Sequence, residues 1–447
     1  MRARTVARRT AVIACALAGC YDSTAGPALP SEAVYVRFPP DSMFIGQTAQ
    51  IIAVATGPDS ADVAWPQFAW TSSDTSVIIV DSTGAILGRE AGAATIRAQF
   101  GEDADSVVVR VVMRDVSNGV AFERMSFGEN ALCALSSVGT AFCVPRNSAS
   151  DELPQFEKLP GAQTVSLVSL AASTFHQCGL TQAGAMYCWG TNATGVFLAA
   201  VVASPTAPTI GGGAREFRAL AAGSNPGVIR SASHTCAIES ATRVVMCAGS
   251  NNAGQLGRPG GSDTTVAAVS NNLVAERISA SERRTCAVSD VAEVWCWGGG
   301  GGSSSTPVKL SAASAVSSVY TADRSVCALT VPGELLCTTM GPNTGALAAG
   351  TPLTNVGGSL RFSSVISGTT LTPIFVGGVV SSPFTCGVTL DGDLYCWGDF
   401  PPIAVSSRLG DARFTPVRIA PGIKFRSIAA NLYHLCGVTT DNKLRCQ

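Results

Sequence analysis

The chain contains 447 residues, of which only 14% are charged and 46 are glycine. Soluble domains carry about 25% charged residues, so this composition argues against a disordered or long-helix protein. Thirty Lys and Arg residues against 31 Asp and Glu residues leave a net charge of −1, which excludes the basic surface of a nucleic-acid-binding protein. The length predicts two or three domains. Sixteen cysteines are many for a cytosolic chain and indicate an oxidising compartment.

Residues 1–20 have the pattern of an export signal. A basic stretch precedes a short apolar run, Ala11–Ala18, which is too short to span a bilayer. Leu17-Ala18-Gly19-Cys20 resembles a bacterial lipobox, whose cysteine becomes the lipidated first residue of the mature protein. The resemblance implies a signal peptide over 1–19 and a lipid on Cys20. A cleaved signal that ends by chance in cysteine is the alternative, and both forms predict an exported chain.

Residues 20–33 predict a flexible tether, because they include Gly, Pro and small polar residues. No other segment reaches about 18 uninterrupted apolar residues, so the N-terminal lipid is the expected membrane attachment. These features predict a protein of the cell envelope or cell surface. Tyr21, rather than an aspartate, follows Cys20, and this residue would permit transfer of the lipoprotein to the outer membrane.

Residues 34–113 predict a small antiparallel β-sandwich. Short alternating runs recur there between turn residues, without cysteine and with little helical periodicity. The predicted strands are Val34–Phe38, Ala49–Ala55, Phe68–Thr71, Val77–Val80, Ala94–Ala98 and Val107–Val112.

This segment resembles the group 2 bacterial immunoglobulin-like domain. The matching motifs, in order, are Gly46-Gln47-Thr48, Trp70-Thr71-Ser72-Ser73, Val80-Asp81-Ser82-Thr83-Gly84 and Ala91-Gly92-Ala93-Ala94-Thr95-Ile96. The resemblance implies a spacer or adhesion module, and we find no catalytic constellation in it. We expect Trp70 in the core, and Gly84 and Gly92 in turns that require a positive φ.

Fourteen of the cysteines form seven closely spaced pairs; the other two are Cys15 in the signal and Cys20. The two members of a pair are ten positions apart in six pairs and eleven in one. The pairs are Cys133 with Cys143, Cys178 with Cys188, Cys236 with Cys247, Cys286 with Cys296, Cys327 with Cys337, Cys386 with Cys396, and Cys436 with Cys446. Self-similarity of this kind indicates a repeat architecture.

Each cysteine pair fits a β-hairpin with a short loop. Between Cys386 and Cys396 the chain divides into three strand residues, a three-residue loop and three strand residues. Such loops need a left-handed residue at their third position, where glycine or asparagine is favoured. Five hairpins place a suitable residue there: Gly139, Gly184, Gly333, Gly392 and Asn442. Ala292 departs from the rule, and the loop 240–243 has four residues.

The hairpin register makes each pair a candidate disulfide. If Thr389 and Asp393 form the hydrogen-bonded pair that closes the loop, alternation places Cys386 opposite Cys396 at a non-hydrogen-bonded position. Cα atoms lie about 4.5 Å apart there, within the disulfide range of about 4.4–6.8 Å. Each bond would stabilise the fold by about 2–3 kcal/mol in the chain-entropy model. The alternative, that some pairs stay reduced in the core, fits an exported chain less well.

The hairpins and their flanks resemble the repeats of the regulator of chromosome condensation family. Cys-Trp-Gly occurs at 188–190, 296–298 and 396–398, and Gly249–Gly257 reads Gly-Ser-Asn-Asn-Ala-Gly-Gln-Leu-Gly. The resemblance covers residues 114–447 and implies an all-β fold, a seven-bladed β-propeller with one disulfide per blade. Because the last repeat stops directly after its third strand, we expect a segment near 114–121 to supply the missing outer strand.

Three groups of residues could suggest bound ions or phosphates, but each has a simpler interpretation. The histidines His176, His234 and His434 each precede a cysteine by two positions, as a zinc ligand could. Other repeats hold alanine, arginine, serine or phenylalanine at that position, so a shared ligand role is not supported. Asp391-Gly392-Asp393 lacks the remaining oxygen ligands of a calcium loop. Gly298–Gly302 does not join a strand to a helix, as a phosphate-binding loop would.

The sequence therefore predicts a binding protein without catalytic residues, metals or cofactors. No serine–histidine–acid series or cysteine–histidine pair is recognisable. The expected partner is an envelope or extracellular protein, or a glycan, and not nucleic acid. Loops between blades are the expected binding surface, with the long insertions 191–216, 298–312 and 338–378 as its variable part.

Other functions stay open at this point. Family members in eukaryotes catalyse guanine-nucleotide exchange and contact chromatin, but export, disulfides and the lack of a basic surface argue against that role. An envelope carbohydrate-binding protein or an enzyme acting in the central channel is the main alternative. Acids, histidines or stacked aromatics lining the channel would favour it, whereas small or apolar residues would count against it. A purely structural envelope component is the third possibility.

Overall fold

The computed structural model describes most of residues 33–446. Within that range it does not describe 38, 41, 46, 58–66, 90, 129–130, 145–154, 161–164, 174, 191, 193–195, 198–208, 225–232, 282, 300–303, 322–325, 339–352, 356–361, 368–384, 398–416 and 431–434. The described residues are almost entirely β-structure and include one short 3₁₀ helix, η2 (Ser270–Asn272). None of their helices is long and apolar enough to cross a membrane. The predicted signal, Cys20 and the tether up to residue 32 lie outside them.

Nine strands form three sheets in the N-terminal region. They are β1 (Ala33–Arg37), β2 (Ser42–Phe44), β3 (Thr48–Gln50), β4 (Ile52–Thr56), β5 (Ala69–Ser72), β6 (Ile78–Val80), β7 (Ala85–Gly88), β8 (Gly92–Phe100) and β9 (Asp103–Val112). The sheet orders are β2-β9-β8-β5, β3-β7-β6 and β1-β4. Ile86 of the three-stranded sheet and Ile96 and Val109 of the four-stranded sheet are buried in one apolar core.

The structure differs from the sequence prediction at several points of this region. The run Ala49–Ala55 forms two strands, β3 and β4, which belong to different sheets, and β2 and β7 were not predicted. Trp70 is half-buried and packs against the core. Gly84 has the expected positive φ of +84°, whereas Gly92 begins β8 without one. A Cβ atom on Gly92 would lie 2.8 Å from Cγ2 of Val77, so close packing rather than a turn requires this glycine.

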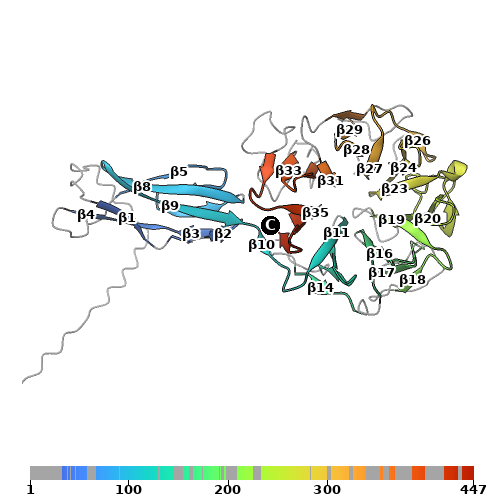
Figure 1. The fold of residues 1–447 in the computed structure, drawn as a ribbon, viewed down its shortest axis with the longest axis horizontal. Helices are drawn as coiled ribbons and strands as arrows, with labels where there is room; N and C mark the ends of the chain where they lie inside the picture. Colours follow the sequence, from blue (N-terminus) through green and yellow to red (C-terminus); the bar gives the residue numbers. More distant parts are fainter. Residues whose placement is uncertain are drawn as a thin grey trace, which may run out of the picture.

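Seven four-stranded antiparallel sheets follow, arranged around a common centre (Figure 1). We call each sheet a blade. Blade 1 contains β11 (Phe122–Gly128), β12 (Ala131–Ser136), β13 (Ala141–Cys143) and β14 (Glu157–Lys158). Blade 2 contains β15 (Ser169–Ala172), β16 (His176–Leu180), β17 (Met186–Gly190) and β18 (Thr209–Gly211). Blade 3 contains β19 (Phe217–Ser224), β20 (Ser233–Glu239), β21 (Val245–Gly249) and β22 (Asp263–Ala268).

The remaining blades repeat the same strand order. Blade 4 contains β23 (Ala275–Ala280), β24 (Arg284–Ser289), β25 (Val294–Gly298) and β26 (Val308–Lys309). Blade 5 contains β27 (Val316–Thr321), β28 (Val326–Thr330), β29 (Leu335–Thr338) and β30 (Leu353–Asn355). Blade 6 contains β31 (Phe362–Ser367), β32 (Thr385–Thr389), β33 (Leu394–Trp397) and β34 (Val417–Ile419). Blade 7 contains β35 (Phe425–Ala430), β36 (Leu435–Thr439), β37 (Leu444–Cys446) and β10 (Arg114–Asp115).

The first strand of each blade lies next to the centre, and we call these seven strands the inner strands. Neighbouring inner strands contact one another in chain order, and β35 contacts β11 to complete the ring. Side-chain hydroxyls satisfy backbone N–H groups across the boundaries: Ser126 Oγ accepts from Ala172 N at 2.9 Å, and Ser279 Oγ accepts from Thr321 N at 3.1 Å. Small residues are therefore needed where the inner strands converge.

Each blade contains one disulfide between its second and third strands. The seven bonds join the cysteine pairs given above, with Cα–Cα distances of 4.0–4.1 Å. In blade 6, Cys386 lies directly opposite Cys396, and Thr389 N donates to Asp393 O at 2.9 Å. The hairpin register expected from the loop length is therefore the register of the structure.

The ring closes through residues from both ends of the described chain. Strand β10 pairs with β37 and is the fourth strand of the last blade, as predicted from the position of the last cysteine. Val116 N also donates to Leu444 O, and Phe122 N to Asn442 O, each at 2.9 Å. Ala429 and Leu444 of blade 7 share an apolar cluster with Leu132 of blade 1. Hydrogen bonds and apolar packing thus join blade 7 to blade 1.

The N-terminal region and the propeller are joined without a linker. Strand β9 ends at Val112, and β10 begins at Arg114. Ile45 and Met113 pack in one apolar cluster with Ala420 of the blade 6–blade 7 connection. The Arg114 guanidinium lies 4.4 Å from the centre of the Phe44 ring, a cation–π contact. The closing strand of the propeller is therefore a direct continuation of the sandwich.

Candidate interaction surface on the hairpin face

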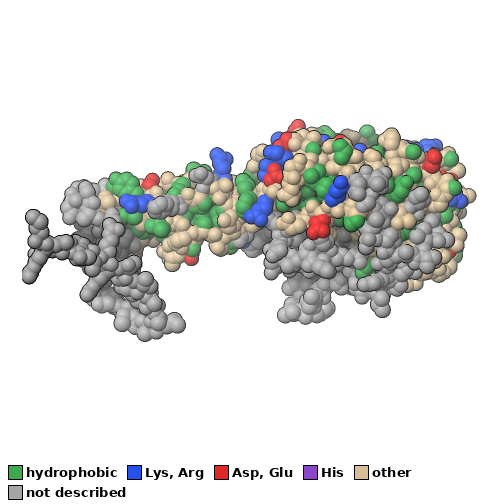
Figure 2. Space-filling model, turned by 90° about the horizontal axis from the view of Figure 1, so that it is seen from below, with side chains coloured by type: hydrophobic (Ala, Val, Ile, Leu, Met, Phe, Trp, Pro, Cys, Tyr) green, Lys and Arg blue, Asp and Glu red, His purple; other side chains and the backbone are tan. Residues whose placement is uncertain are grey.

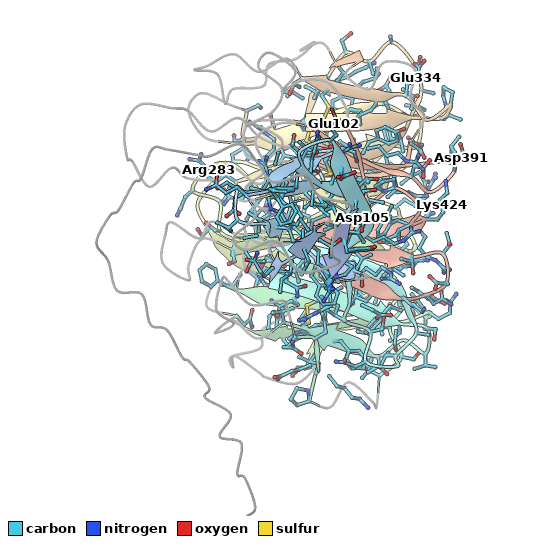
Figure 3. All side chains as sticks on the ribbon, turned by 90° about the vertical axis from the view of Figure 1, so that its left-hand side faces the viewer. Glu102, Asp105, Arg283, Glu334, Asp391 and Lys424 are labelled. Carbon is cyan, nitrogen blue, oxygen red and sulfur yellow. A yellow bond between two sulfur atoms is a disulfide. The ribbon has the colours of Figure 1, made fainter. Side chains whose placement is uncertain are left out.

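The loops between the second and third strands of all blades lie on one face of the propeller. Inner strands also begin on this face, because the four strands of each blade are antiparallel. Figure 3 shows Glu334, Asp391 and Lys424 on this side and Arg283, from the loop between β23 and β24, on the opposite side. We call these seven loops the hairpin tips and their side of the molecule the hairpin face. The tips are 137–139, 182–184, 240–243, 290–292, 331–333, 390–392 and 440–442.

A left-handed residue and backbone hydrogen bonds hold the hairpin tips in place. The predicted glycines and Asn442 have φ between +65° and +88°, and Ala292 and Arg243 adopt φ of +62° and +60° at the same point of their loops. Gly392 N donates to Thr389 O within its own tip, and its carbonyl accepts from Phe425 N of the next blade at 2.8 Å. Four other tips accept a hydrogen bond from the following inner strand in the same way, and Gly139 accepts one from Leu167, two residues before β15. The tips are therefore fixed relative to one another.

Four hairpin tips expose a large apolar side chain. The residues are 68–74% exposed and belong to blades 1, 4, 5 and 6: Val138, Val291, Val331 and Leu390. Such positions commonly hold Gly, Pro, Asn, Asp or Ser. Because these side chains are mostly in water, burial in the fold does not explain them. Val331 and Leu390 are the first residue of their tips, and Val138 and Val291 are the second. Their recurrence in four of the seven tips distinguishes them from apolar residues scattered singly over a surface.

Charged side chains between the tips are mostly paired. Glu276 on β23 accepts from Arg218 of β19 at 2.8 Å and from Arg243 of the blade 3 tip at 2.6 Å. Asp393 accepts from Arg418 at 2.6 Å and from Lys424 at 2.8 Å. Burial opposes ionisation of the Asp393 carboxyl, but these hydrogen bonds more than offset it and lower its pKa. Figure 2 shows how sparse and separated charged groups are on the side of the molecule that it presents.

Six inner strands have a β-bulge at the same place, one residue after they begin on the hairpin face. The register shifts lie between Phe122 and Arg124, Phe217 and Ala219, Ala275 and Arg277, Val316 and Ser318, Phe362 and Ser364, and Phe425 and Ser427. A bulge bends its strand and changes the direction of a side chain. Arg218, Glu276 and Arg426 are the extra residues of three bulges, and they lie beside the centre of the hairpin face.

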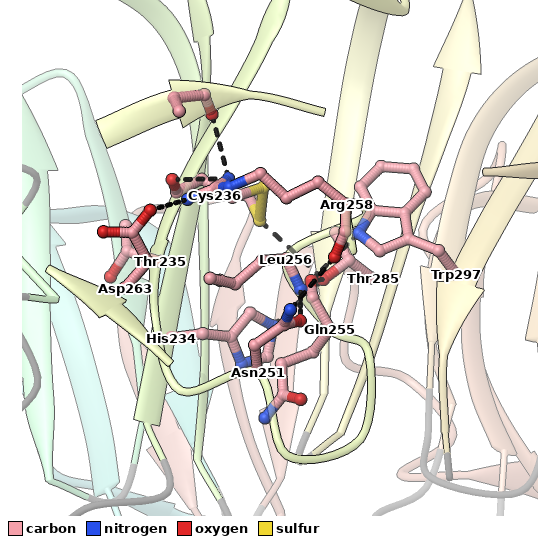
Figure 4. Close-up of a disulfide and its surroundings, with 12 residues drawn as sticks. His234, Thr235, Cys236, Asn251, Gln255, Leu256, Arg258, Asp263, Thr285 and Trp297 are labelled. Atoms are coloured by element: carbon pink, nitrogen blue, oxygen red, sulfur yellow. Dashed lines mark hydrogen bonds and ion pairs between the residues drawn. A yellow bond between two sulfur atoms is a disulfide. The ribbon is translucent and has the colours of Figure 1, made fainter. Parts of the chain in front are cut away.

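Two of the three histidines form buried contacts between neighbouring blades. Nε2 of His176 lies 2.7 Å from Thr235 Oγ1, and Nε2 of His234 lies 2.9 Å from Thr285 Oγ1 (Figure 4 shows His234). Thr285 Oγ1 donates its proton to Gln255 O, so it accepts from His234 and assigns the imidazole proton to Nε2. Complete burial lowers the pKa of His234 to about 3, which keeps the ring neutral.

The motif Gly249–Gly257 forms a loop that is hydrogen-bonded to itself and to blade 4. Asn251 Oδ1 accepts from Leu256 N at 2.9 Å, and its Nδ2 donates to the carbonyls of Arg258 and Gly260. Gln255 O also accepts from Trp297 Nε1 at 2.9 Å (Figure 4). The asparagine and tryptophan of the repeat motif therefore act in folding, since their polar atoms are used to position one blade against the next.

The other residues considered from the sequence have structural roles where they are described. The cysteines beside His176 and His234 are in disulfides, and no group of three His, Cys, Asp or Glu residues in the described part of the chain could hold a metal ion. Asp391-Gly392-Asp393 is the tip and strand start of blade 6. His434, Cys20 and residues 300–302 of the glycine run lie outside the described residues.

The insertions 191–216, 298–312 and 338–378, expected between blades, lie there only in part. Residues 212–216, 310–312 and 356–361 connect one blade to the next, whereas 191–208, 299–307 and 339–352 each connect the third and fourth strands of one blade. The ends of the third and fourth strands that these segments join lie opposite the hairpin tips. Most of these residues are not described, so the described surface that remains for binding is the hairpin face.

Comparison with known proteins identifies the fold. No sequence model of a known protein family matches the chain, and no curated protein matches it in sequence. The crystal structure of human WBSCR16 matches with a TM-score of 0.54 and 14% identity over 77% of this chain and 92% of that chain. Saccharomyces cerevisiae Prp20p matches with a TM-score of 0.54 and 14% identity over 86% and 92%. Yeast RCC1 (Prp20) bound to Kap60 matches with a TM-score of 0.51 and 17% identity over 70% of this chain and 78% of that chain. The chain thus has a propeller fold similar to these RCC1-type proteins.

Sequence reasoning missed the residues that distinguish the hairpin face. The exposed apolar tips could have been found by aligning the seven loops, because Val138, Val291, Val331 and Leu390 all fall in positions that turns do not require to be apolar. The arginines of the inner strands could not be grouped from the sequence, because they come from four different blades. Only the ring arrangement brings them to one centre.

Proposed function

We propose that the chain is an exported, lipid-anchored cell-envelope protein that binds a partner protein through the hairpin face of a seven-bladed propeller. The signal pattern that ends at Cys20 supports export and lipid attachment. The motifs and paired sheets of residues 34–113 support an immunoglobulin-like spacer. The seven described sheets and the closing strand β10 support a ring of seven blades. Yeast Prp20, of similar fold, was solved bound to Kap60.

The exposed apolar tips carry this proposal. Exposed apolar side chains that recur on one face of a soluble protein are typical of an interaction site, and rigid presentation reduces the entropy lost on binding. The tips are anchored by backbone hydrogen bonds to the next blade, so Val291 and Leu390 are held in place before a partner arrives. Protein interfaces combine such apolar groups with polar ones, and the ion pairs of Glu276 and Asp393 provide polar groups on the same face.

The composition of the inner strands favours this function over a carbohydrate-binding protein or an enzyme acting in the channel. Their described residues are mostly Ser, Ala and aliphatic; the acids are Glu123 and Glu276, and the aromatic residues are five phenylalanines and Tyr320. His176 and His234 are buried between blades and engaged with threonines. Catalysis or sugar stacking in a channel would need acids, available histidines or aromatic faces there.

The test is capture of partners from a native envelope extract by the full-length protein and two multiple variants. The tip variant replaces the four exposed apolar side chains: Val138→Ser, Val291→Ser, Val331→Ser and Leu390→Ser. The control variant replaces three side chains of the sandwich that are 48–52% exposed: Tyr35→Ser, Ile52→Ser and Val108→Ser. Proteins retained by the wild type should be lost at least tenfold with the tip variant and kept with the control. Equal retention by all three proteins would contradict the proposal.

Lipid attachment has a separate test. The substitution Cys20→Ser should move the protein from the membrane fraction to the soluble fraction, because the N-terminal lipid is the proposed anchor. Metabolic labelling with a fatty-acid analogue should be lost at the same time. A variant that remains in the membrane fraction would show that the anchor lies elsewhere.

A further inference from the structure

The hairpin face has a cationic centre that the fold does not require. Arginine occurs on four inner strands, always as the second or third residue: Arg124 on β11, Arg218 on β19, Arg277 on β23 and Arg426 on β35. These strands belong to blades 1, 3, 4 and 7 and begin on the hairpin face around one centre. We call these four residues the central arginines.

The central arginines extend into solvent rather than into the blade boundaries. All four are exposed, although their neighbours Phe122, Phe217, Ala275 and Phe425 are buried. Arg218 pairs with Glu276, whereas the described residues provide no ion pair for Arg124, Arg277 or Arg426. Arg277 donates to its neighbour's carbonyl, Glu276 O, and Arg426 to Thr440 O at 2.7 Å. Among the described residues, three guanidinium groups at the centre therefore have no carboxylate partner.

Charge is distributed unevenly over the hairpin face. The described inner strands contain four arginines, no lysine and no aspartate, and their two glutamates are Glu123 and Glu276. The carboxylate of Glu276 is already shared between Arg218 and Arg243. Three of the seven tips carry an exposed aspartate, Asp290, Asp391 or Asp441, and the blade 3 tip carries Arg243. Asp290 lies 3.8 Å from Arg243, and Asp441 lies 3.5 Å from Lys443. The face thus has an excess of arginine at its centre, whereas the tips around it include apolar, acidic and basic residues.

We propose that the central arginines bind the carboxylates of an acidic segment in the partner protein. This inference rests on the proposed function, because the apolar tips around the centre indicate a protein as the occupant. Arginine presents a planar fork of donors that matches a carboxylate, and it is weakly hydrated compared with lysine. Opposite charge at the centre specifies where the carboxylates of the segment bind.

The experiment measures binding of a fluorescein-labelled hexaglutamate peptide to the full-length protein by anisotropy at low ionic strength. A hexaglutamine peptide is the neutral probe. The test variant carries Arg124→Gln and Arg277→Gln, and the control variant carries Arg97→Gln and Arg110→Gln, two exposed arginines of the sandwich. Both variants remove two positive charges, so a difference between them reports position rather than net charge. A third variant, Arg426→Gln, tests blade 7, and melting curves confirm that all variants are folded.

We expect hexaglutamate to bind the wild type and the control with the same affinity, to within twofold, and to bind the test variant at least tenfold more weakly. Binding should also weaken as salt is added, because exposed charges are screened. Three results would overturn the proposal: no binding to the wild type, equal binding to the test and control variants, or equal binding of hexaglutamine. Displacement of the peptide by millimolar inorganic phosphate would assign the site to a free anion instead. The tip variant should keep the peptide, so failure here is distinguishable from failure of the proposed function.

Discussion

The sandwich and the propeller bury their apolar residues in different ways. In the sandwich one core lies among strands far apart in sequence, such as β3 and β9, and residues 34–113 contain no cysteine. In the propeller the clusters lie mostly between successive blades, as where Val294 of blade 4 meets Val319 of blade 5, and each blade has its own disulfide. The core of the propeller is thus assembled from local repeats, whereas that of the sandwich is not.

This difference teaches where each region is vulnerable. A repeat array distributes its stability over similar interfaces between neighbours. The one non-local interface of the propeller is its closure, where β10 pairs with β37. Strand β10 directly continues β9 of the sandwich, so the sandwich, which has no disulfide, helps to hold the ring of the propeller closed. The following predictions test this comparison from the largest expected effect to the smallest.

Reduction of the seven disulfides should destabilise the propeller and leave the sandwich folded. Each disulfide is worth about 2–3 kcal/mol, and the seven together exceed the stability of about 5–15 kcal/mol that is typical of a domain. With excess reductant we expect the blades to lose amide protection while β8 and β9 keep theirs, as measured by hydrogen exchange and mass spectrometry. Simultaneous loss of protection in β8–β9 would show that the sandwich depends on the propeller for its stability. An untreated sample provides the control.

Acid should weaken the propeller through His234. Its pKa is about 3 in the folded chain and about 6.5 unfolded, so the unfolded state binds the additional proton between these values. The free energy of unfolding should therefore fall by about 1.4 kcal/mol per pH unit below pH 6.5, so that the total decrease at pH 4 is about 3 kcal/mol. In His234→Gln, whose amide can still donate to Thr285, this part of the pH dependence should be absent. Parallel stability curves for both proteins between pH 6.5 and 4 would contradict the assignment.

A glycine in place of Ala292 should stabilise the blade 4 hairpin tip. Ala292 adopts φ +62° where most other tips have glycine, and this conformation costs a residue with a Cβ atom about 1–2 kcal/mol. Ala292→Gly should raise the free energy of unfolding by up to about 1 kcal/mol, because added freedom in the unfolded chain offsets part of the relief. Gly392→Ala should lower it by a similar amount. Chemical denaturation would measure both, and a loss of stability in Ala292→Gly would show that the tip is not strained.

The repeats made the propeller easier to predict than the sandwich. The cysteine spacing predicted the hairpins, the register of Cys386 with Cys396 and the left-handed glycines, because these are consequences of loop length alone. In the sandwich, β2 and β7 are three and four residues long and offered too little alternation to be recognised. The run Ala49–Ala55 was read as one strand because its apolar pattern continues while its pairing partner changes at Ile51.

The candidate site was beyond prediction for a different reason. Its residues are unremarkable one at a time: an arginine near a strand start or a valine in a turn. Arg124 and Arg426 are 302 positions apart in the sequence, and they share one centre because β35 contacts β11. The long insertions were expected between blades, whereas the larger part of each connects strands within one blade, because strand order within a repeat was not known before the sheet pairing.

The sequence by itself determined the all-β class, the pairing of fourteen cysteines and the geometry of most turns. Loop length, alternation and glycine position act over about ten residues, so they can be read without knowing the fold. The tertiary structure decided which residues meet: the histidine–threonine contacts between blades, the closure by β10 and the central arginines. These depend on how many sheets surround the centre and on which face each strand begins, which local interactions do not specify.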